Sequence, residues 1–209
     1  MTKPSPATLH HAFLARVLRK YELAGVVTTN YDLLAERTLR HRPMVRPPAP
    51  GFTYAGLPEE PLQGSSAFSV RHKWVNLTGT VTLCKLHGSL NWVASGDGLH
   101  AYADCRPAFR SGATSYIVAP KPEKTVPARL EPIWKAAATL LASAEEWIVV
   151  GYSAPKYDTA ACDLLAAAAG ASGHIRVVDR DRRVVERYTQ LTARAVSWEG
   201  DLASFVGHG

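Results

Sequence analysis

The chain has 209 residues, of which 46% are hydrophobic. It is long enough to bury one sizeable core, and we expect a single domain over residues 1–209. Its formal net charge of +6 suits a nucleic acid, an anionic dinucleotide or an acidic partner, and the charge alone does not distinguish these three. The first twenty residues contain no apolar run of signal-peptide length, and no later stretch approaches a membrane span. We therefore expect a cytoplasmic protein without membrane association.

Two further classes of protein are not indicated. The three cysteines are widely separated and form no C-x-x-C pair, which argues against a disulfide framework and against a cysteine-built zinc site. We expect reduced thiols and no bound metal. Nucleic acid binding is also not indicated, because the two groups of basic residues lie among polar neighbours without interleaved aromatic residues. These groups are Arg37, Arg40, His41, Arg42 and Arg46, and Arg176, Arg180, Arg182, Arg183 and Arg187.

In the first half of the chain, apolar periodicity predicts short strands and helices around one irregular segment. Helices are expected over residues 8–21 and 32–39, with a short strand at 25–27 between them. The Pro-rich segment 42–73 is predicted to be a surface loop or small subdomain rather than a central strand. The next predicted elements are a strand at 81–86, a hairpin of 90–93 with 99–103, and a strand at 116–118.

The second half of the chain alternates regularly between the two kinds of element. The expected order is helix 130–144, strand 147–150, helix 159–169, strand 175–178, helix 182–191, strand 195–198 and a short terminal helix. Such alternation is typical of parallel strands joined by helical crossovers. We predict an α/β fold: a Rossmann-like, doubly wound, mainly parallel sheet with helices on both faces.

Four polar clusters each follow a predicted strand directly. They are residues 28–32, 87–89, 151–153 and 179–181. In doubly wound sheets ligands bind beyond the carboxyl ends of the strands, so we expect the four clusters to form one site at one edge of the sheet.

Each cluster has a chemical and a structural interpretation. Asn30 and Asp32 could hold a ligand through amide and carboxylate groups, or Asn30 could shape the turn and Asp32 cap the following helix. His87 could accept a proton from a ribose hydroxyl, with Gly88 allowing close backbone approach, or it could be a hydrogen-bonded structural histidine.

The clusters of the second half leave the same two possibilities. Gly151 and Ser153 could receive a phosphate or ribose, or they could simply turn the chain. Asp179 follows a strand where Rossmann sheets often meet an adenosine ribose, or it caps the next helix.

Three strings together resemble the sirtuin-like family. They are Thr28-Thr29-Asn30-Tyr31-Asp32, Lys85-Leu86-His87-Gly88-Ser89-Leu90-Asn91-Trp92 and Val149-Val150-Gly151-Tyr152-Ser153. Their order and approximate spacing are those of the family, and they are most similar to its bacterial branch, whose domains act as NAD glycohydrolases, often in antiphage defence.

The resemblance implies a role for each motif residue. Asn30 would position the attacking water or ribose, and His87 would act as the base on a ribose hydroxyl. The remaining residues would bind NAD, the substrate, or its product ADP-ribose, with Asp32 at the nicotinamide amide and Asp179 near the adenosine. These binding residues are Thr28, Thr29, Asp32, Gly88, Gly151, Tyr152, Ser153 and Asp179.

The chain departs from the family pattern in three places. The family's glycine-rich phosphate loop has no counterpart upstream of the first helix, so we expect an N-terminally truncated domain, or one completed by self-association or a companion protein. The four-cysteine zinc module of the deacylating members is absent, and Thr29 replaces the usual Gln. The leading prediction is cleavage of the nicotinamide–ribose bond of NAD. The alternatives are a catalytically degenerate NAD- or ADP-ribose-binding or interaction module and an NAD-dependent protein deacylase.

Overall fold

A computed structural model describes residues 6–39, 51–57, 81–96, 98–102, 114–119, 125–170 and 173–207. The chain divides into two compact units. Unit 1 comprises Met1–Glu22, Pro120–Thr125 and Ala137–Gly209, and unit 2 comprises Leu23–Ala119 and Val126–Ala136.

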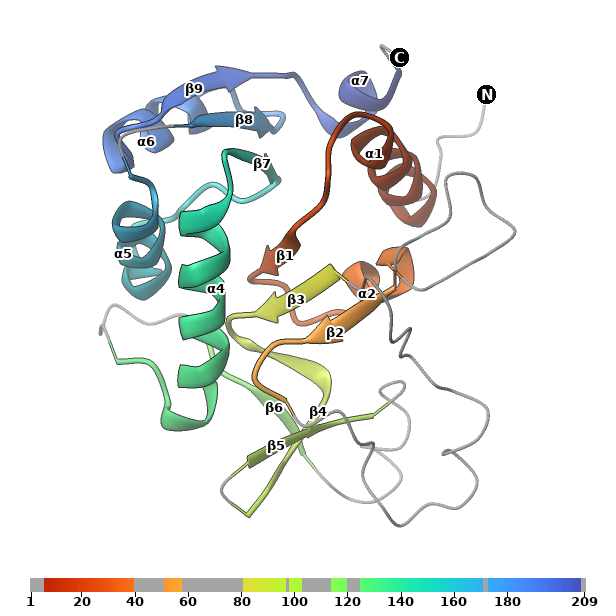
Figure 1. Ribbon diagram of the computed structural model, residues 1–209, viewed down its shortest axis with the longest axis vertical. Helices are drawn as coiled ribbons and strands as arrows, with labels where there is room; N and C mark the ends of the chain where they lie inside the picture. Colours follow the sequence, from red (N-terminus) through yellow and green to blue (C-terminus); the bar gives the residue numbers. More distant parts are fainter. Residues whose placement is uncertain are drawn as a thin grey trace. The chain divides into compact units, whose positions relative to one another are not determined.

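Unit 2 contains a three-stranded parallel sheet with the order β1-β3-β2 (Figure 1). Its strands are β1 (Gly25–Thr28), β2 (Phe52–Tyr54) and β3 (Val81–Lys85), and α2 (Leu34–Leu39) follows β1. The central strand β3 carries the fully buried Leu83 and Cys84. Strands β1 and β3 and helix α2 agree with the sequence predictions, whereas β2 was not predicted.

Strand β2 lies within the Pro-rich segment. It pairs only with β3 among the described strands, so it is an outer strand of this sheet and not a central one. Except for residues 51–57, the segment 42–73 lies outside the described residues.

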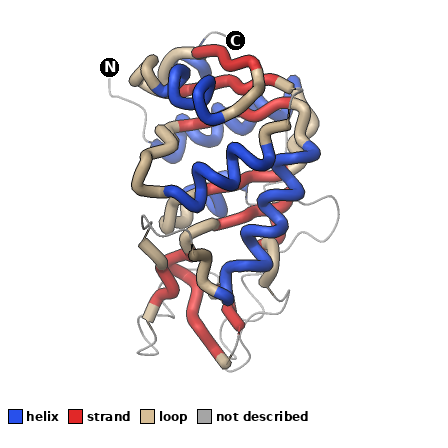
Figure 2. The backbone as a smooth tube through the Cα atoms, turned by 90° about the vertical axis from the view of Figure 1, so that its left-hand side faces the viewer, coloured by secondary structure: helices blue, strands red, loops and turns tan. Residues whose placement is uncertain are grey.

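An antiparallel sheet completes unit 2, with the order β5-β4-β6. Its strands are β4 (Gly88–Ser95), β5 (Gly98–Ala101) and β6 (Ser115–Ile117). The predicted hairpin is confirmed, because β4 and β5 pair in antiparallel fashion with Ser95 opposite Gly98 (strands are red in Figure 2). Strand β4, however, begins two residues earlier than predicted, so Gly88 and Ser89 belong to a strand rather than to a loop.

A continuous helical stretch follows this sheet. It consists of the 3₁₀ turn η1 (Ala128–Leu130) and the helix α4 (Glu131–Ser143), close to the predicted span. Leu130, Ile133 and Trp134 are buried in its first part. The boundary between the two units falls within α4, after Ala136.

Unit 1 contains a second parallel sheet, with the order β7-β8-β9. Along the chain its strands alternate with helices, as predicted. The elements are α1 (Pro6–Lys20), β7 (Glu146–Val150), α5 (Thr159–Ala168), β8 (His174–Val178), α6 (Val184–Leu191), β9 (Ala195–Trp198) and α7 (Leu202–Gly207).

The core of unit 1 joins strands and helices. Trp147 of β7, Ile175 and Val177 of β8, and Val184 and Tyr188 of α6 form one buried apolar cluster. Residues of α5 complete it, and Phe13 of α1 packs against Phe205 of α7 with ring centroids 5.6 Å apart. Burial of this surface is the main contribution to the stability of the unit.

The fold class is therefore α/β and Rossmann-like, with parallel strands connected through helices, as the sequence predicts. Within the described parts of the chain, none of the helices combines the length and the apolar character needed to cross a membrane.

Candidate functional site

The loop after β1 carries the first group of predicted site residues. Thr28 and Thr29 are half-buried, whereas Asn30 and Asp32 are exposed. The Thr28 hydroxyl accepts a hydrogen bond from the Asn30 backbone N–H at 3.1 Å, and the Asp32 carboxylate accepts one from the Leu34 N–H at 2.9 Å. The structural interpretation of Asp32 is thus correct for one of its oxygens, which supports the start of α2.

The turn after β3 carries the second group. His87 lies between β3 and β4 and is only 5% exposed. Its ring meets the Trp134 ring edge to face, with centroids 5.9 Å apart, and its backbone carbonyl accepts the Val118 N–H at 2.9 Å. The next residue, Gly88, has a φ of +81°. Its conformation is one that residues with a side chain rarely adopt, so it fixes where the chain turns from β3 into β4.

The two groups lie at the same edge of one sheet. Because β1 and β3 are parallel neighbours in register from Gly25–Thr82 to Thr28–Lys85, both strands end side by side. The ladder continues beyond the strands, since the Leu86 N–H donates to the Thr28 carbonyl at 3.0 Å and the Leu90 N–H donates to the Tyr31 carbonyl at 3.0 Å. Hydrogen bonds on both sides of Asn30 therefore hold its loop against Leu86, which directly precedes His87, and Leu90, which follows His87 by three residues.

A buried polar network lies beneath this loop. The Lys85 ammonium and the Glu36 carboxylate form an ion pair at 2.8 Å with both side chains fully buried. Lys85 also donates to the Asp32 backbone carbonyl. The Tyr54 hydroxyl donates to Glu36 Oε1 at 2.9 Å and accepts from Asn91 Nδ2 at 3.1 Å.

The network includes residues that the sequence analysis did not select. Lys85 and Asn91 stand within one of the strings that resemble the family, so only that resemblance could have drawn attention to them. Glu36 appears in the sequence as an ordinary polar residue of a short helix. Burial lowers the pKa of the Lys85 ammonium, and the negative charge of Glu36 opposes that shift.

Unit 1 brings the other two predicted groups together. Gly151 follows β7 with a φ of +63°, and its N–H donates to the Val178 carbonyl at 3.1 Å. Asp179 comes directly after Val178, so the two groups lie at adjacent carboxyl ends of β7 and β8. Asp179 also accepts the Asp181 N–H at 2.8 Å, which is a local turn rather than a bond into α6.

The residues after Gly151 are held by side chains of the same unit. The Tyr152 hydroxyl donates to Asp158 Oδ2 at 2.7 Å, and the Tyr188 hydroxyl donates to the Tyr152 carbonyl at 3.2 Å. Arg187 donates to the Ser153 carbonyl at 2.9 Å. The Tyr152 hydroxyl therefore serves the structure of the turn, while its half-buried side chain packs against the buried apolar cluster of unit 1.

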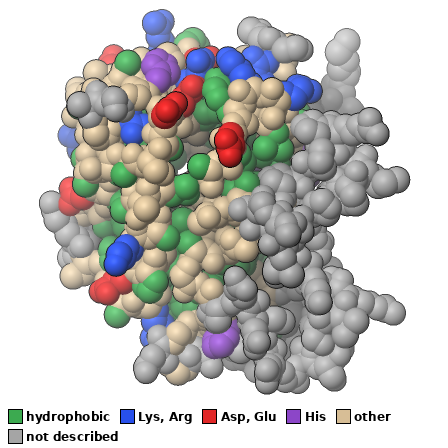
Figure 3. Space-filling model, in the orientation of Figure 1, with side chains coloured by type: hydrophobic (Ala, Val, Ile, Leu, Met, Phe, Trp, Pro, Cys, Tyr) green, Lys and Arg blue, Asp and Glu red, His purple; other side chains and the backbone are tan. Residues whose placement is uncertain are grey.

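The charged side chains of unit 1 compensate one another in part. Arg176 is paired with both Glu146 and Glu199, and acidic and basic side chains stand close together on the face drawn in Figure 3. In the described part of the chain, His, Cys, Asp and Glu side chains do not gather in groups that could hold a metal ion.

Comparison with known proteins identifies the fold. No protein-family model matches the sequence, and the curated proteins contain no match to it. Among solved structures, one similar chain is a Sir2 protein in complex with an inhibitor, 2'-O-acetyl-ADP-ribose and a deacetylated p53 peptide. The alignment has a TM-score of 0.54 and 16% identity, and covers 99% of this chain and 70% of the other.

A second similar structure is Sir2Tm bound to a propionylated peptide. Its TM-score is 0.55 at 15% identity, and the alignment covers 96% of this chain and 68% of the other. The fold of the chain is thus sirtuin-like. The resemblance noted in the motifs is supported at the level of the fold.

Proposed function

We propose that the protein is an NAD glycohydrolase, which cleaves the nicotinamide–ribose bond of NAD to give nicotinamide and ADP-ribose. The observation that carries the proposal is the pairing of β1 with β3, which puts the Asn30 loop beside the His87 turn in a sirtuin-like fold. Both residues stand where open α/β sheets bind their ligands, beyond the carboxyl ends of parallel strands.

The proposed reaction requires that the water and the ribose be oriented, and it does not require a metal. The carbon–nitrogen bond breaks with its electron pair leaving on nicotinamide, and the ribose passes through an oxocarbenium-like state. Water then bonds to the ribose carbon and releases a proton. In this proposal the exposed Asn30 amide orients the water, and the His87 imidazole accepts a hydrogen bond from a ribose hydroxyl.

The dinucleotide is proposed to bind through the other motif residues. Asp32 contributes its exposed carboxylate, of which Oδ1 already serves Leu34. Gly151 contributes backbone with positive φ beside open space, and Asp179 contributes a carboxylate for a ribose hydroxyl. The missing side chain of Gly88 faces the Tyr116 carbonyl of β6 instead, so Gly88 contributes the turn that places His87. Thr28, Thr29, Tyr152 and Ser153 complete the proposed set.

Nicotinamide release from NAD by the purified protein tests the proposal. We expect release by the wild type and a fall of about 100-fold or more for Asn30→Ala and for His87→Ala. His100→Ala, which removes a histidine of β5 instead, is the matched control and should stay near the wild-type rate. Release that survives both site substitutions would refute the assigned roles. Binding of NAD without its consumption would favour the non-catalytic module.

A second candidate is an NAD-dependent protein deacylase. It is favoured by the two solved structures, one containing a deacetylated peptide and the other a propionylated one. Incubation with acetylated and propionylated peptides distinguishes the two reactions. A hydrolase releases nicotinamide at the same rate with or without peptide, whereas a deacylase releases it only together with loss of the acyl group.

We further propose a role in bacterial antiphage defence, on the support of the motif resemblance at residues 28–32 and 85–92. Bacteria expressing the wild type should lose NAD on infection, and phage should form fewer plaques on them than on bacteria expressing Asn30→Ala. Equal plaque numbers would count against this setting. Self-association, or a companion protein, also remains a prediction that light scattering of the purified chain can test.

A further inference from the structure

The Asn30 loop is held at three positions by residues of β3, of β4 and of the turn between these strands. Leu86 binds the Thr28 carbonyl, Leu90 and the Ser89 hydroxyl bind the Tyr31 carbonyl, and the Lys85 ammonium binds the Asp32 carbonyl. The first two contacts extend an ordinary backbone ladder. The third is different, because it brings a charged side chain into a fully buried place to hold one peptide oxygen.

This third contact is costly for the fold. The side chains of Lys85 and Glu36 are both fully buried. Removing a charge from water costs several kcal/mol per ion, and the attraction between the two charges offsets a free energy of only about the same size. The pair is also imperfectly satisfied, since Glu36 Oε2 is buried without a hydrogen-bond partner among the described residues. Two apolar side chains would fill the same space without that cost. Stability alone therefore does not explain the pair.

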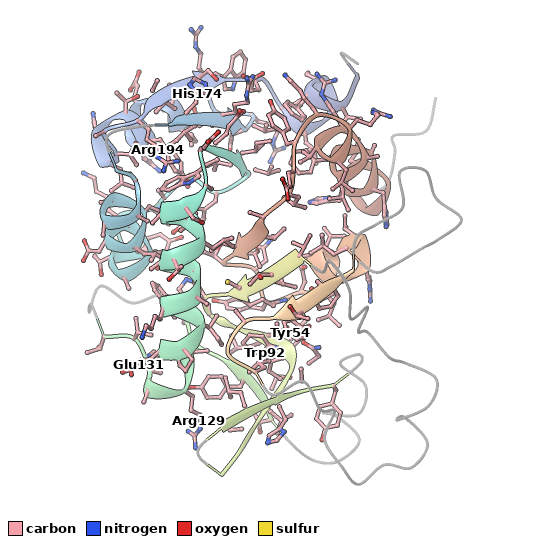
Figure 4. All side chains as sticks on the ribbon, in the orientation of Figure 1. Tyr54, Trp92, Arg129, Glu131, His174 and Arg194 are labelled. Atoms are coloured by element: carbon pink, nitrogen blue, oxygen red, sulfur yellow. The ribbon has the colours of Figure 1, made fainter. Side chains whose placement is uncertain are left out.

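The residues around the Lys85–Glu36 ion pair show which elements the pair connects. Glu36 lies on α2, which begins two residues after Asp32, and its Oε1 accepts bonds from both Lys85 and Tyr54. Tyr54 in turn packs edge to face on Trp92, with ring centroids 5.2 Å apart (Figure 4). Lys85 thus links the end of β3 to both the loop and the helix that follows it. Lys85 also stands only two residues before His87 in the sequence.

We infer that Lys85, neutralised by Glu36, is a positioning residue that fixes the Asn30–Asp32 loop relative to the His87 turn. This inference rests on the proposed NAD cleavage. Lys85 is too deeply buried to touch the substrate. Its effect on the reaction passes through the Asp32 carbonyl and the loop that bears Asn30.

The test removes the anchor without leaving a lone buried charge. In Lys85→Met/Glu36→Leu both charges are gone, and in Lys85→Met/Glu36→Gln an acceptor for Tyr54 is kept, so one variant remains informative if the other does not fold. In folded protein we expect kcat for nicotinamide release to fall about 10- to 100-fold, with KM for NAD changed less than about threefold. The control Tyr54→Phe removes one bond to Glu36 but keeps the lysine–carbonyl contact. Its kcat should stay near that of the wild type.

A second readout separates failure of this inference from failure of the proposed function. Amide hydrogen exchange is measured at Asn30 and Leu34, whose N–H groups are bonded within the loop. Both double variants should exchange these amides faster than the wild type and Tyr54→Phe do, whether or not the wild type cleaves NAD. Unchanged kcat in a folded, active double variant, or unchanged protection of the two amides, would overturn the inference.

Discussion

At the scale of single residues, Gly88 and Gly151 show how one backbone conformation can have two different costs. Both have positive φ, +81° and +63°. A Cβ added to Gly88 would stand 2.1 Å from the Tyr116 carbonyl oxygen, whereas one added to Gly151 would meet no atom within 4 Å. Gly88 therefore permits the close approach of β4 to β6 as well as the turn, while Gly151 permits only the turn.

This contrast predicts the effect of substitution at the two positions. Gly151→Ala should lower the free energy of unfolding by about 1–2 kcal/mol, the cost of the left-handed conformation. Gly88→Ala should lower it by at least about 3 kcal/mol, because β4 and β6 must also move apart. Urea denaturation of the two variants and the wild type measures both values. Equal losses would show that the packing of Gly88 against Tyr116 is not the deciding factor.

At the scale of elements, Arg194 fastens the ends of two helices in unit 1. It is 6% exposed and lies just before β9. Its guanidinium donates to the Ala144 carbonyl, after α4, at 2.9 Å and to the Ala169 carbonyl, after α5. It also stacks on the Trp147 ring, 4.4 Å from the centroid. Carbonyl groups at helix ends lack intrahelical partners, so one arginine satisfies two ends at once.

We predict that Arg194→Met destabilises the protein by about 2–4 kcal/mol, since the buried carbonyl of Ala169 and the partly buried carbonyl of Ala144 lose their donor. Arg194→Lys should recover only part of this, because an ammonium lacks the planar fork that spans both carbonyls. Arg183→Met is the matched control: that side chain is 84% exposed in its pair with Asp181, and its loss should leave thermal unfolding unchanged. An Arg194→Met variant that melts like Arg183→Met would contradict the assigned role.

The elements also show which structural features the sequence could predict. The alternation of strands and helices from residue 130 onward is regular, and every element expected there is present. Strand β2 was not predicted because it is three residues long and stands among prolines, and its pairing with β3 is a contact distant in the sequence. The start of β4 was also missed, because Gly88 and Ser89 have a composition typical of turns.

The candidate site was predictable to a similar degree. Strand ends could be recognised from the apolar runs, and the rule for parallel sheets then places Asn30 near His87, as the structure does. The Lys85–Glu36 pair could not be predicted in this way, since a lysine and a glutamate 49 positions apart are normally exposed. The structural roles of Asp32 and Tyr152 depend on hydrogen bonds whose partners cannot be identified from the sequence.

At the scale of the whole molecule, the fold is maintained with few identical residues. The similar solved chains share 15% and 16% identity with this one. Chains that differ at most positions thus share this fold, in keeping with the tolerance of cores for changes of side chain that keep volume and patterning. Each unit brings two of the four predicted clusters to adjacent strand ends. The joint use of all four by one ligand remains a prediction.

Ligand binding by the intact protein gives the last prediction. ADP-ribose, the proposed product, is not consumed, so it reports binding separately from catalysis. A ligand present at 100 times its Kd stabilises a native protein by about 2.7 kcal/mol, which for a chain of this size corresponds to a rise in Tm of roughly 5–10 °C. We expect such a rise for the wild type, measured by thermal unfolding with increasing ADP-ribose.

The variants make this measurement specific. Ser153→Ala and Asp179→Ala, which change two of the proposed binding residues of unit 1, should each shift the dependence of Tm on ADP-ribose to higher concentration. Gln190→Ala, an exposed polar residue of α6, should leave it unchanged. A rise in Tm without nicotinamide release from NAD would identify a binding module. No rise at millimolar ADP-ribose would show that the sirtuin-like fold here no longer binds the nucleotide, because a native state that binds its ligand must be stabilised by it.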